Sequence, residues 1–176
     1  KKKGFSFGPS FIGLEKSGLI ICKSEIKYVF ISHAHIDHIG FIPTLMKELP
    51  DAVFYMTEAT KELAKFQLYD KNFSEEKNLV SEKLAIQSMF DRIHIVPFMG
   101  TLNIGNIEVS FYPAGHIPGA MMTLFKWNGK KLLYTGDYSS SETALTDKYY
   151  LPSNLSVDYL INCGLHAKND SYYKSN

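Results

Sequence analysis

The sequence has few cysteines and no long apolar run, and each shortage excludes a class of protein. Only two of the 176 residues are cysteine, Cys22 and Cys163, and neither lies in a CxxC pair, which excludes a disulfide-rich mini-protein or a zinc finger. No stretch approaches the roughly 18 consecutive apolar residues that a membrane-spanning helix needs. No apolar signal-peptide core follows the lysine-rich start. We therefore expect a protein of a reducing compartment, cytoplasmic or nuclear, with no membrane partner.

The sequence also lacks a strong excess of charge. The formal net charge is +1, so no strongly basic face marks a nucleic-acid-binding protein. This counts only mildly against RNA as a partner, because metal ions and a few local cations can hold phosphates on a neutral protein. Apolar residues make up 45% and charged residues 21% of the chain, which is typical of a globular protein. We expect one domain over residues 1–176 with a proper core.

Short apolar runs between turn residues predict strands, and longer stretches between them predict helices. The expected strands are Ser10–Leu14, Leu19–Cys22, Tyr28–Ser32, Val53–Met56, Ile107–Tyr112, Met121–Trp127, Lys131–Thr135 and Val157–Asn162. The expected helices are Ile39–Leu49, Glu58–Tyr69 after Thr57, and Glu75–Phe90 after Ser74. Asn128-Gly129 predicts a tight hairpin turn, because both residues tolerate positive φ. The order of elements favours an α/β sandwich in which helices cover mixed β-sheets.

A dense group of metal-binding side chains follows the apolar run that ends at Ile31. His33, His35, Asp37 and His38 fall within six residues. Imidazole nitrogens and carboxylate oxygens bind zinc, manganese or iron, and a loop at a strand end can direct several of them at one point. A single histidine is more often a core or surface residue, but four such ligands together are hard to explain without a metal.

Two further candidate ligands follow glycines later in the chain. His116 follows Gly115 and Asp137 follows Gly136, and glycine lets the backbone bend close to a bound ion. Taken alone, each is better explained as a surface histidine or a turn aspartate. With the first group they give six ligands, enough for two metal ions roughly 3.5–4 Å apart. We expect His94 to pack or face solvent, and His166 is a weaker candidate ligand.

Three stretches resemble the motifs of a known family. His33-Ala34-His35-Ile36-Asp37-His38 resembles the HxHxDH motif of metallo-β-lactamase-fold hydrolases. Ala114-Gly115-His116 and Thr135-Gly136-Asp137 resemble their third and fourth motifs. The longer stretches 31–40, 114–120 and 133–139 are similar to the β-CASP RNA-processing nucleases, which include the cleavage and polyadenylation endonuclease. The resemblance implies an α/β fold, the metallo-β-lactamase-type αββα sandwich, present in part.

The resemblance also implies a metal centre and a reaction. One ion would be bound by His33, His35 and His116, the second by Asp37 and His38, and Asp137 would bridge them. Zinc is the expected metal, with manganese or iron as alternatives. A metal-activated hydroxide, oriented by Asp37, would attack the phosphodiester of an RNA substrate. The implied function is a metal-dependent phosphodiesterase that cleaves RNA.

Some features of the family pattern are missing from this sequence. The usual aspartate before the histidine motif is absent from Gly18–Cys22, and Asn162-Cys163-Gly164 stands where an acidic motif is usual. No β-CASP cap is evident, so the sequence resembles the first half of the catalytic domain: a fragment, a chain whose site a partner chain or a C-terminal half completes, or an inactive copy. The alternative functions are a metallo-hydrolase of a small ester or thioester, and a non-catalytic scaffold that binds a nuclease partner.

Overall fold

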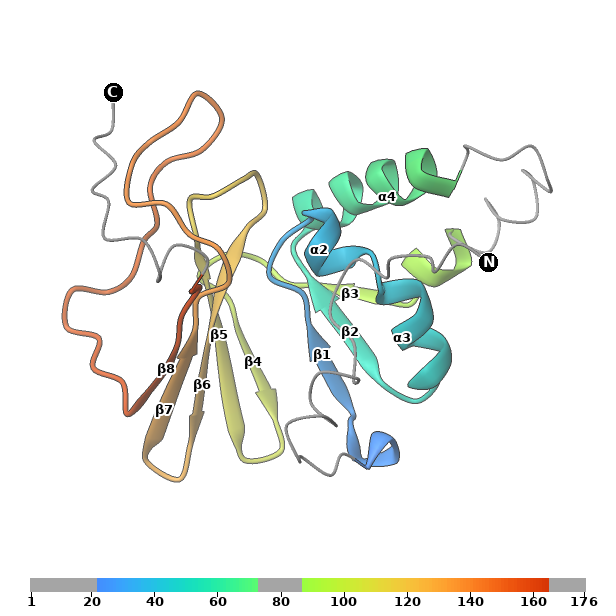
Figure 1. Cartoon of the computed structure of the whole chain (residues 1–176). Helices are drawn as coiled ribbons and strands as arrows, with labels where there is room; N and C mark the ends of the chain where they lie inside the picture. Colours follow the sequence, from blue (N-terminus) through green and yellow to red (C-terminus); the bar gives the residue numbers. More distant parts are fainter. Residues whose placement is uncertain (1–21, 73–86, 165–176) are drawn as a thin grey trace. The chain divides into compact units, whose positions relative to one another are not determined.

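The computed structural model describes residues 22–72 and 87–164 of the chain (Figure 1). The chain forms two compact units, Lys1–Val96 and Pro97–Asn176, and each has a β-sheet of its own. The strand expected at Ser10–Leu14 lies outside the described residues, as do the strand expected at Leu19–Cys22, apart from Cys22, and most of the helix expected at Glu75–Phe90.

The first unit contains a three-stranded parallel sheet. Its strands are β1 (Tyr28–Phe30), β2 (Val53–Met56) and β3 (Ile93–Ile95), in the spatial order β1-β2-β3. All pairs are parallel, with Tyr28 opposite Val53 and Phe54 opposite Ile93. β2 has the predicted bounds, β1 starts as predicted but is shorter than the expected Tyr28–Ser32, and β3 was not predicted. Because the three strands run in the same direction, their carboxyl ends all lie at the same edge of the sheet.

The helices of this unit differ from the prediction at one point. A single helix was expected at Ile39–Leu49, but the chain forms α2 (Ile36–Ile39) and α3 (Ile42–Glu48). Pro43 explains the division: proline has no N–H and its ring clashes inside a helix, so α3 starts anew with Pro43 in its first turn.

The longest helix of the first unit confirms its predicted start. The helix α4 spans Glu58–Asn72, and the Thr57 hydroxyl accepts a hydrogen bond from the Thr60 backbone N–H at 3.2 Å. This contact satisfies one of the amides left unpaired at a helix start. A short 3-10 helix, η1 (Lys23–Glu25), precedes β1, and residues 87–90 are helical just before β3.

The second unit contains a five-stranded sheet with the order β4-β5-β6-β7-β8. These strands are β4 (Thr101–Ile104), β5 (Ile107–Pro113), β6 (Met121–Trp127), β7 (Lys130–Tyr134) and β8 (Tyr159–Ile161). The first four are antiparallel and β8 runs parallel to β7. The predicted hairpin is confirmed, with positive φ at Asn128 and Gly129. The strand β4 was not predicted, and β8 is shorter than the expected Val157–Asn162.

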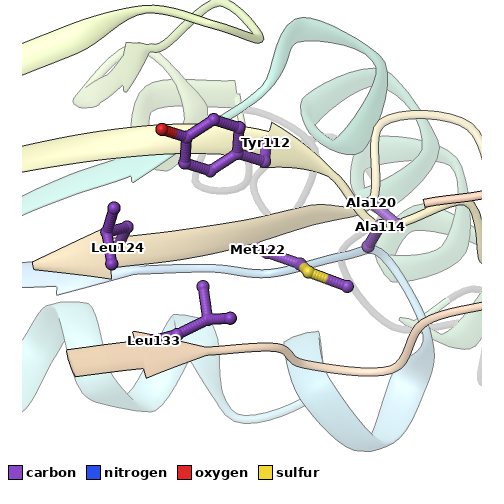
Figure 2. Packing of buried hydrophobic residues seen from close by; sticks show 6 residues of the cluster. All are labelled: Tyr112, Ala114, Ala120, Met122, Leu124 and Leu133. Carbon is purple, nitrogen blue, oxygen red and sulfur yellow. The ribbon is translucent and has the colours of Figure 1, made fainter. Parts of the chain in front are cut away.

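One face of this second sheet carries a compact apolar core (Figure 2). The cluster consists of Tyr112, Ala114, Ala120, Met122, Leu124 and Leu133. Tyr112 lies opposite Met122, and Leu124 lies opposite Leu133, so the side chains form a continuous layer across β5, β6 and β7. Leu151, Leu155 and Val157 from the following segment pack against it.

The two β-sheets, together with the helices of the first unit, confirm the predicted α/β class. Within residues 22–72 and 87–164, no helix is both long and apolar enough to cross a membrane.

Candidate metal centre

The first group of candidate ligands begins at the carboxyl end of β1. The backbone N–H of Ile31 donates to the Tyr55 carbonyl at 2.9 Å, which holds the chain against β2 one residue beyond the strand. Ile31, Ser32, His33 and Ala34 are all buried. Open α/β sheets bind ligands at the carboxyl ends of their strands, and His33 stands at such an end in the centre of a packed region.

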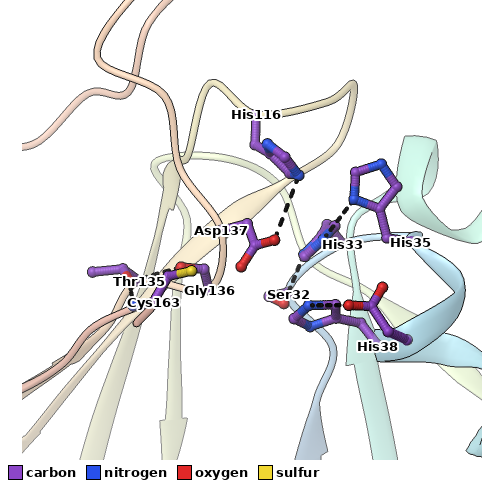
Figure 3. Close-up of polar contacts among 10 residues, drawn as sticks. Ser32, His33, His35, His38, His116, Thr135, Gly136, Asp137 and Cys163 are labelled. Carbon is purple, nitrogen blue, oxygen red and sulfur yellow. Dashed lines mark hydrogen bonds and ion pairs between the residues drawn. The ribbon is translucent and has the colours of Figure 1, made fainter. Parts of the chain in front are cut away.

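His33 makes two side-chain contacts that suit a metal ligand (Figure 3). Its Nδ1 lies 3.1 Å from the Ser32 hydroxyl and its Nε2 lies 3.1 Å from His35 Nδ1. Two nitrogens bound to one tetrahedral zinc at about 2.0–2.1 Å lie roughly 3.3–3.4 Å apart. The His33–His35 pair therefore fits a shared divalent cation with almost no movement of the rings.

Ser32 completes the arrangement around His33. A metal-binding histidine usually donates its second ring N–H to a nearby acceptor, which sets the tautomer and the ring orientation. With Nδ1 protonated and donating to the Ser32 hydroxyl, the Nε2 lone pair points toward His35. The sequence analysis did not identify Ser32, although its place directly before the first histidine was a usable signal.

Asp37 and His38 lie on the short helix α2, which starts inside the motif. His35 is its N-terminal cap, and its carbonyl accepts from His38 N at 2.9 Å and from Ile39 N at 3.0 Å. Ile39 is fully buried and anchors the turn. His38 Nε2 lies 3.7 Å from Asp37 Oδ2 (Figure 3), and the His38 ring centroid lies 4.0 Å from that of His33. All four predicted ligands of the first unit therefore belong to one local cluster.

The second group of candidate ligands lies at one end of the second sheet. His116 follows β5 and Asp137 follows β7. Because β6 runs antiparallel to both neighbours, the end of β5 and the end of β7 fall at the same edge. His116 Nε2 lies 3.7 Å from Asp137 Oδ2, and both side chains are about three-quarters buried (Figure 3). The expected approach of these two residues is confirmed within this unit.

Gly115 is required by the loop that carries His116. Its φ is +71°, which favours glycine, and an added Cβ would lie 2.5 Å from Tyr149 N and 2.6 Å from Lys148 C. The Thr146 hydroxyl also donates to the Gly115 carbonyl at 3.0 Å. The loop before His116 is thus packed against backbone, which leaves it little freedom.

Thr135 fixes the turn that carries Asp137. Its hydroxyl lies 2.7 Å from the Gly136 carbonyl and accepts from Cys163 N at 3.3 Å (Figure 3). The same hydroxyl lies 3.2 Å from Asn162 Oδ1. Its own N–H donates to the Ile161 carbonyl at 3.0 Å. Asn162 and Cys163, at the place where the family resemblance leads us to expect an acidic motif, both contact Thr135. The sequence analysis did not predict this network.

The remaining predicted residues behave as follows. His94 is exposed on β3 with its ring 5.6 Å from the Tyr55 ring, so the expectation that it packs or faces solvent is confirmed. His166 lies outside the described residues. Cys22 and Cys163, the two cysteines of the sequence, are not joined in a disulfide. Each unit brings its own candidate ligands together, and a single centre made from all six residues stays a prediction.

Known proteins resemble this chain across both ligand groups. The metallo-beta-lactamase superfamily matches residues 23–169. Cleavage and polyadenylation specificity factor 73 of Drosophila melanogaster is 35% identical over 128 residues, or 70% of this chain and 19% of that protein. Cleavage and polyadenylation specificity factor subunit 3-I of Arabidopsis thaliana is 36% identical over 124 residues, or 68% and 18%. Endoribonuclease ysh1 of Aspergillus fumigatus is 29% identical over 168 residues, or 91% and 18%.

These matches bear on the expectations from the motifs. All six candidate ligands fall inside the superfamily match, and the resemblance to cleavage and polyadenylation endonucleases is confirmed. The chain spans less than a fifth of the length of these relatives.

Proposed function

This chain belongs to the metallo-beta-lactamase superfamily, and from that premise we propose that it acts as a metal-dependent phosphodiesterase on RNA. The observation that carries the proposal is the 3.1 Å approach of His33 Nε2 to His35 Nδ1, at a spacing suited to one cation. The 3.7 Å approach of His116 to Asp137 supports it from the second unit.

The superfamily implies divalent metal ions, and the imidazole-rich ligand set favours zinc over manganese or iron. We propose that His33, His35 and His116 would hold one ion and Asp37 and His38 a second, and that Asp137 would be a ligand shared by both. When bound, such a pair lowers the pKa of a shared water, orients the phosphodiester and offsets the charge that gathers on its oxygens.

The protein's own groups have separate parts in this reaction. The Ser32 hydroxyl accepts a hydrogen bond from the Nδ1–H of His33, and this tautomer leaves the Nε2 lone pair available to bind a metal. Asp37, with its carboxylate mostly exposed at the start of α2, orients the attacking water and accepts its proton. The Thr135 network holds the Asp137 turn in place, so the carboxylate needs little reorganisation to bind.

The relatives favour RNA as the substrate class. The names of the proteins matched here are those of an endoribonuclease and of cleavage and polyadenylation factors, and none names a small ester or thioester. We also propose a cytoplasmic or nuclear location, because the sequence has only two cysteines, far apart and in no CxxC pair, as is usual for proteins of reducing compartments. A partner chain or further segment that completes the site stays a prediction.

Metal analysis combined with RNA cleavage tests the proposed function. We expect two equivalents of tightly bound metal and cleavage of a labelled single-stranded RNA. Asp37→Asn should lower cleavage by at least about 10²–10⁴-fold, the usual contribution of a general base, and should also lower bound metal, because Asp37 is a proposed ligand of the second ion. Asp137→Asn should lower both bound metal and cleavage. Asp51→Asn is the matched control, because Asp51 is exposed in a turn of the first unit and should leave both unchanged.

The alternative functions give different results in the same assays. A non-catalytic scaffold would be metal-free, or would bind metal without cleaving RNA. A hydrolase of small esters would bind two metals and hydrolyse an activated ester, with Asp37→Asn lowering that activity while RNA stays intact. Either result contradicts the proposal.

A further inference from the structure

Three tyrosines are exposed on the segment that follows β7. The exposed fractions are 41% for Tyr138, 37% for Tyr149 and 50% for Tyr150. Large aromatic side chains are commonly buried. A group of them exposed at the surface is a feature of binding sites. Tyr138 directly follows Asp137 in the chain, so a binding site at these tyrosines would serve the candidate ligand group that contains Asp137.

The backbone of this segment is bonded to the strand end that carries His116. Ser139 N donates to the Ala114 carbonyl at 2.9 Å, and Tyr149 N donates to the Ser139 carbonyl at 2.8 Å. Tyr150 N donates to the Pro113 carbonyl at 3.0 Å. Tyr149 N would also lie 2.5 Å from a Cβ at Gly115, the residue before His116. The tyrosines are therefore fixed next to both ligands of the second unit, His116 and Asp137.

The rings of Tyr138 and Tyr149 form an edge-to-face pair. Their centroids are 5.6 Å apart and their planes cross at 88°. In this geometry one ring presents its edge to the face of the other, so each ring keeps at least one face that its partner does not cover. Such a face can accept a planar, unsaturated group by stacking.

The charge around the tyrosines shows what kind of contact is available. Between residues 138 and 150 the charged side chains are Glu142, Asp147 and Lys148, so carboxylates outnumber lysines and phosphates would not be attracted strongly. Within this segment, the ring faces are therefore the groups best suited to bind RNA. Unpaired nucleic-acid bases stack on aromatic side chains with little dependence on sequence, and each such contact contributes substantially to affinity.

We propose that Tyr138 and Tyr149 form a stacking platform for the unpaired bases of single-stranded RNA beside the metal ligands His116 and Asp137. The inference rests on the proposed function, since it assigns these residues to the substrate of the same site. Stacking at a fixed place next to Asp137 would set the position of the strand relative to the reacting phosphodiester. It would also favour single-stranded over duplex RNA, whose bases are already stacked.

Binding of a short fluorescein-labelled oligoadenylate, followed by fluorescence anisotropy, tests the platform. EDTA is present, so that metal-dependent cleavage does not consume the probe. We expect Tyr138→Ala and Tyr149→Ala each to weaken binding by about 5- to 150-fold, the range measured for the loss of one stacked base. Tyr138→Phe and Tyr149→Phe should retain affinity, because the ring face remains. Duplex RNA of the same length should bind more weakly.

Matched controls separate stacking from charge and from loss of fold. Phe66→Ala removes an aromatic ring that is 72% exposed on α4 in the other unit and should leave binding unchanged. Lys148→Ala should have little effect, and affinity should depend only weakly on salt. If circular dichroism shows that an alanine variant is unfolded, Tyr149→Leu keeps an apolar side chain without a stacking face and should lose affinity in the same way.

The results distinguish this inference from the proposed function. Wild-type affinity in Tyr138→Ala and Tyr149→Ala, weakened binding in the phenylalanine variants, a loss with Lys148→Ala as large as with the tyrosines, or no binding by the wild type overturns the platform. Metal content and cleavage are measured separately. Tyrosine-dependent binding without metal or cleavage overturns the proposed function alone, and metal-dependent cleavage that ignores the tyrosines overturns the platform alone.

Discussion

The two groups of candidate ligands are built in different ways. In the first unit, His33, His35, Asp37 and His38 share one loop and one helical turn, so their approach depends mainly on local backbone geometry. In the second unit, His116 and Asp137 are far apart in the sequence and meet because β5 and β7 end at the same edge of an antiparallel sheet. The second group therefore depends on the packing of its sheet, and damage to that packing should affect it first.

Removing core volume beneath the second sheet should have the largest effect. Leu124 is fully buried on β6, between the strands that carry the two ligands. Leu124→Ala should lower the free energy of unfolding by about 2–5 kcal/mol through lost burial and a cavity. Trp127 is the single tryptophan of the chain and lies on the same strand, so its fluorescence during urea unfolding measures the second unit.

The control for this variant is Leu145→Ala, because Leu145 is 79% exposed in the same unit. Its effect should stay within about 0.5 kcal/mol. If both substitutions lower the free energy of unfolding equally, burial of Leu124 does not stabilise the sheet that carries the second ligand group.

Substituting Gly115 should disrupt the second group more locally. Gly115→Ala places a Cβ in the left-handed region, which costs about 1–2 kcal/mol, and also against backbone atoms at 2.5–2.7 Å. Gly129→Ala is a matched control, because Gly129 also has positive φ but has no atom within 4 Å of an added Cβ. Urea unfolding should show a clearly larger loss for Gly115→Ala, and the prediction is wrong if the two losses are equal.

Removing the hydroxyl beside His33 should weaken zinc binding by the first group. Ser32→Ala removes the acceptor that holds the His33 ring, and loss of such a partner usually lowers metal affinity about 10- to 100-fold. Competition with a zinc chelator measures this change. Ser24→Ala, at an exposed position in the same unit, should bind zinc like the wild type. Unchanged zinc affinity in Ser32→Ala would contradict the role of Ser32.

The smallest expected effect concerns the pH dependence of the β7–β8 contact. The Lys130 ammonium and the Lys131 N–H donate to the Asp158 carboxylate and lower its pKa below the ordinary value. A carboxyl with a lower pKa in the folded state stabilises it above the ordinary aspartate pKa of about 3.9, and this contribution is lost as the pH falls through the folded-state pKa.

Asp158→Asn removes this ionisation while keeping the size of the side chain. The free energy of unfolding of the wild type should therefore fall more steeply with acidification than that of Asp158→Asn. The carboxylate is exposed to solvent, so the difference should be small. Parallel curves from neutral to acid pH, measured by Trp127 fluorescence, would contradict the assignment.

Much of the fold could be predicted because its signals are local. The bounds of β2 and β6 match the prediction, since each is a mostly apolar run bounded by polar or turn residues. Asn128-Gly129 predicted its turn through the φ angles that these residues tolerate. The strands β3 and β4 were missed because polar residues interrupt their short sequences, His94 in β3 and Asn103 in β4, and because they are held mainly by pairing with β2 and β5.

The sequence alone determined which residues are the candidate metal ligands, in the dense motif from His33 to His38 and in His116 and Asp137, each of which follows a glycine. Only the tertiary structure decided how those ligands are held. Ser32 orients His33, Thr135 holds the Asp137 turn through Asn162 and Cys163, and β6 brings the ends of β5 and β7 to one edge. The reason is physical: residue type sets which atoms can bind a metal, whereas contacts between segments distant in sequence set where those atoms lie.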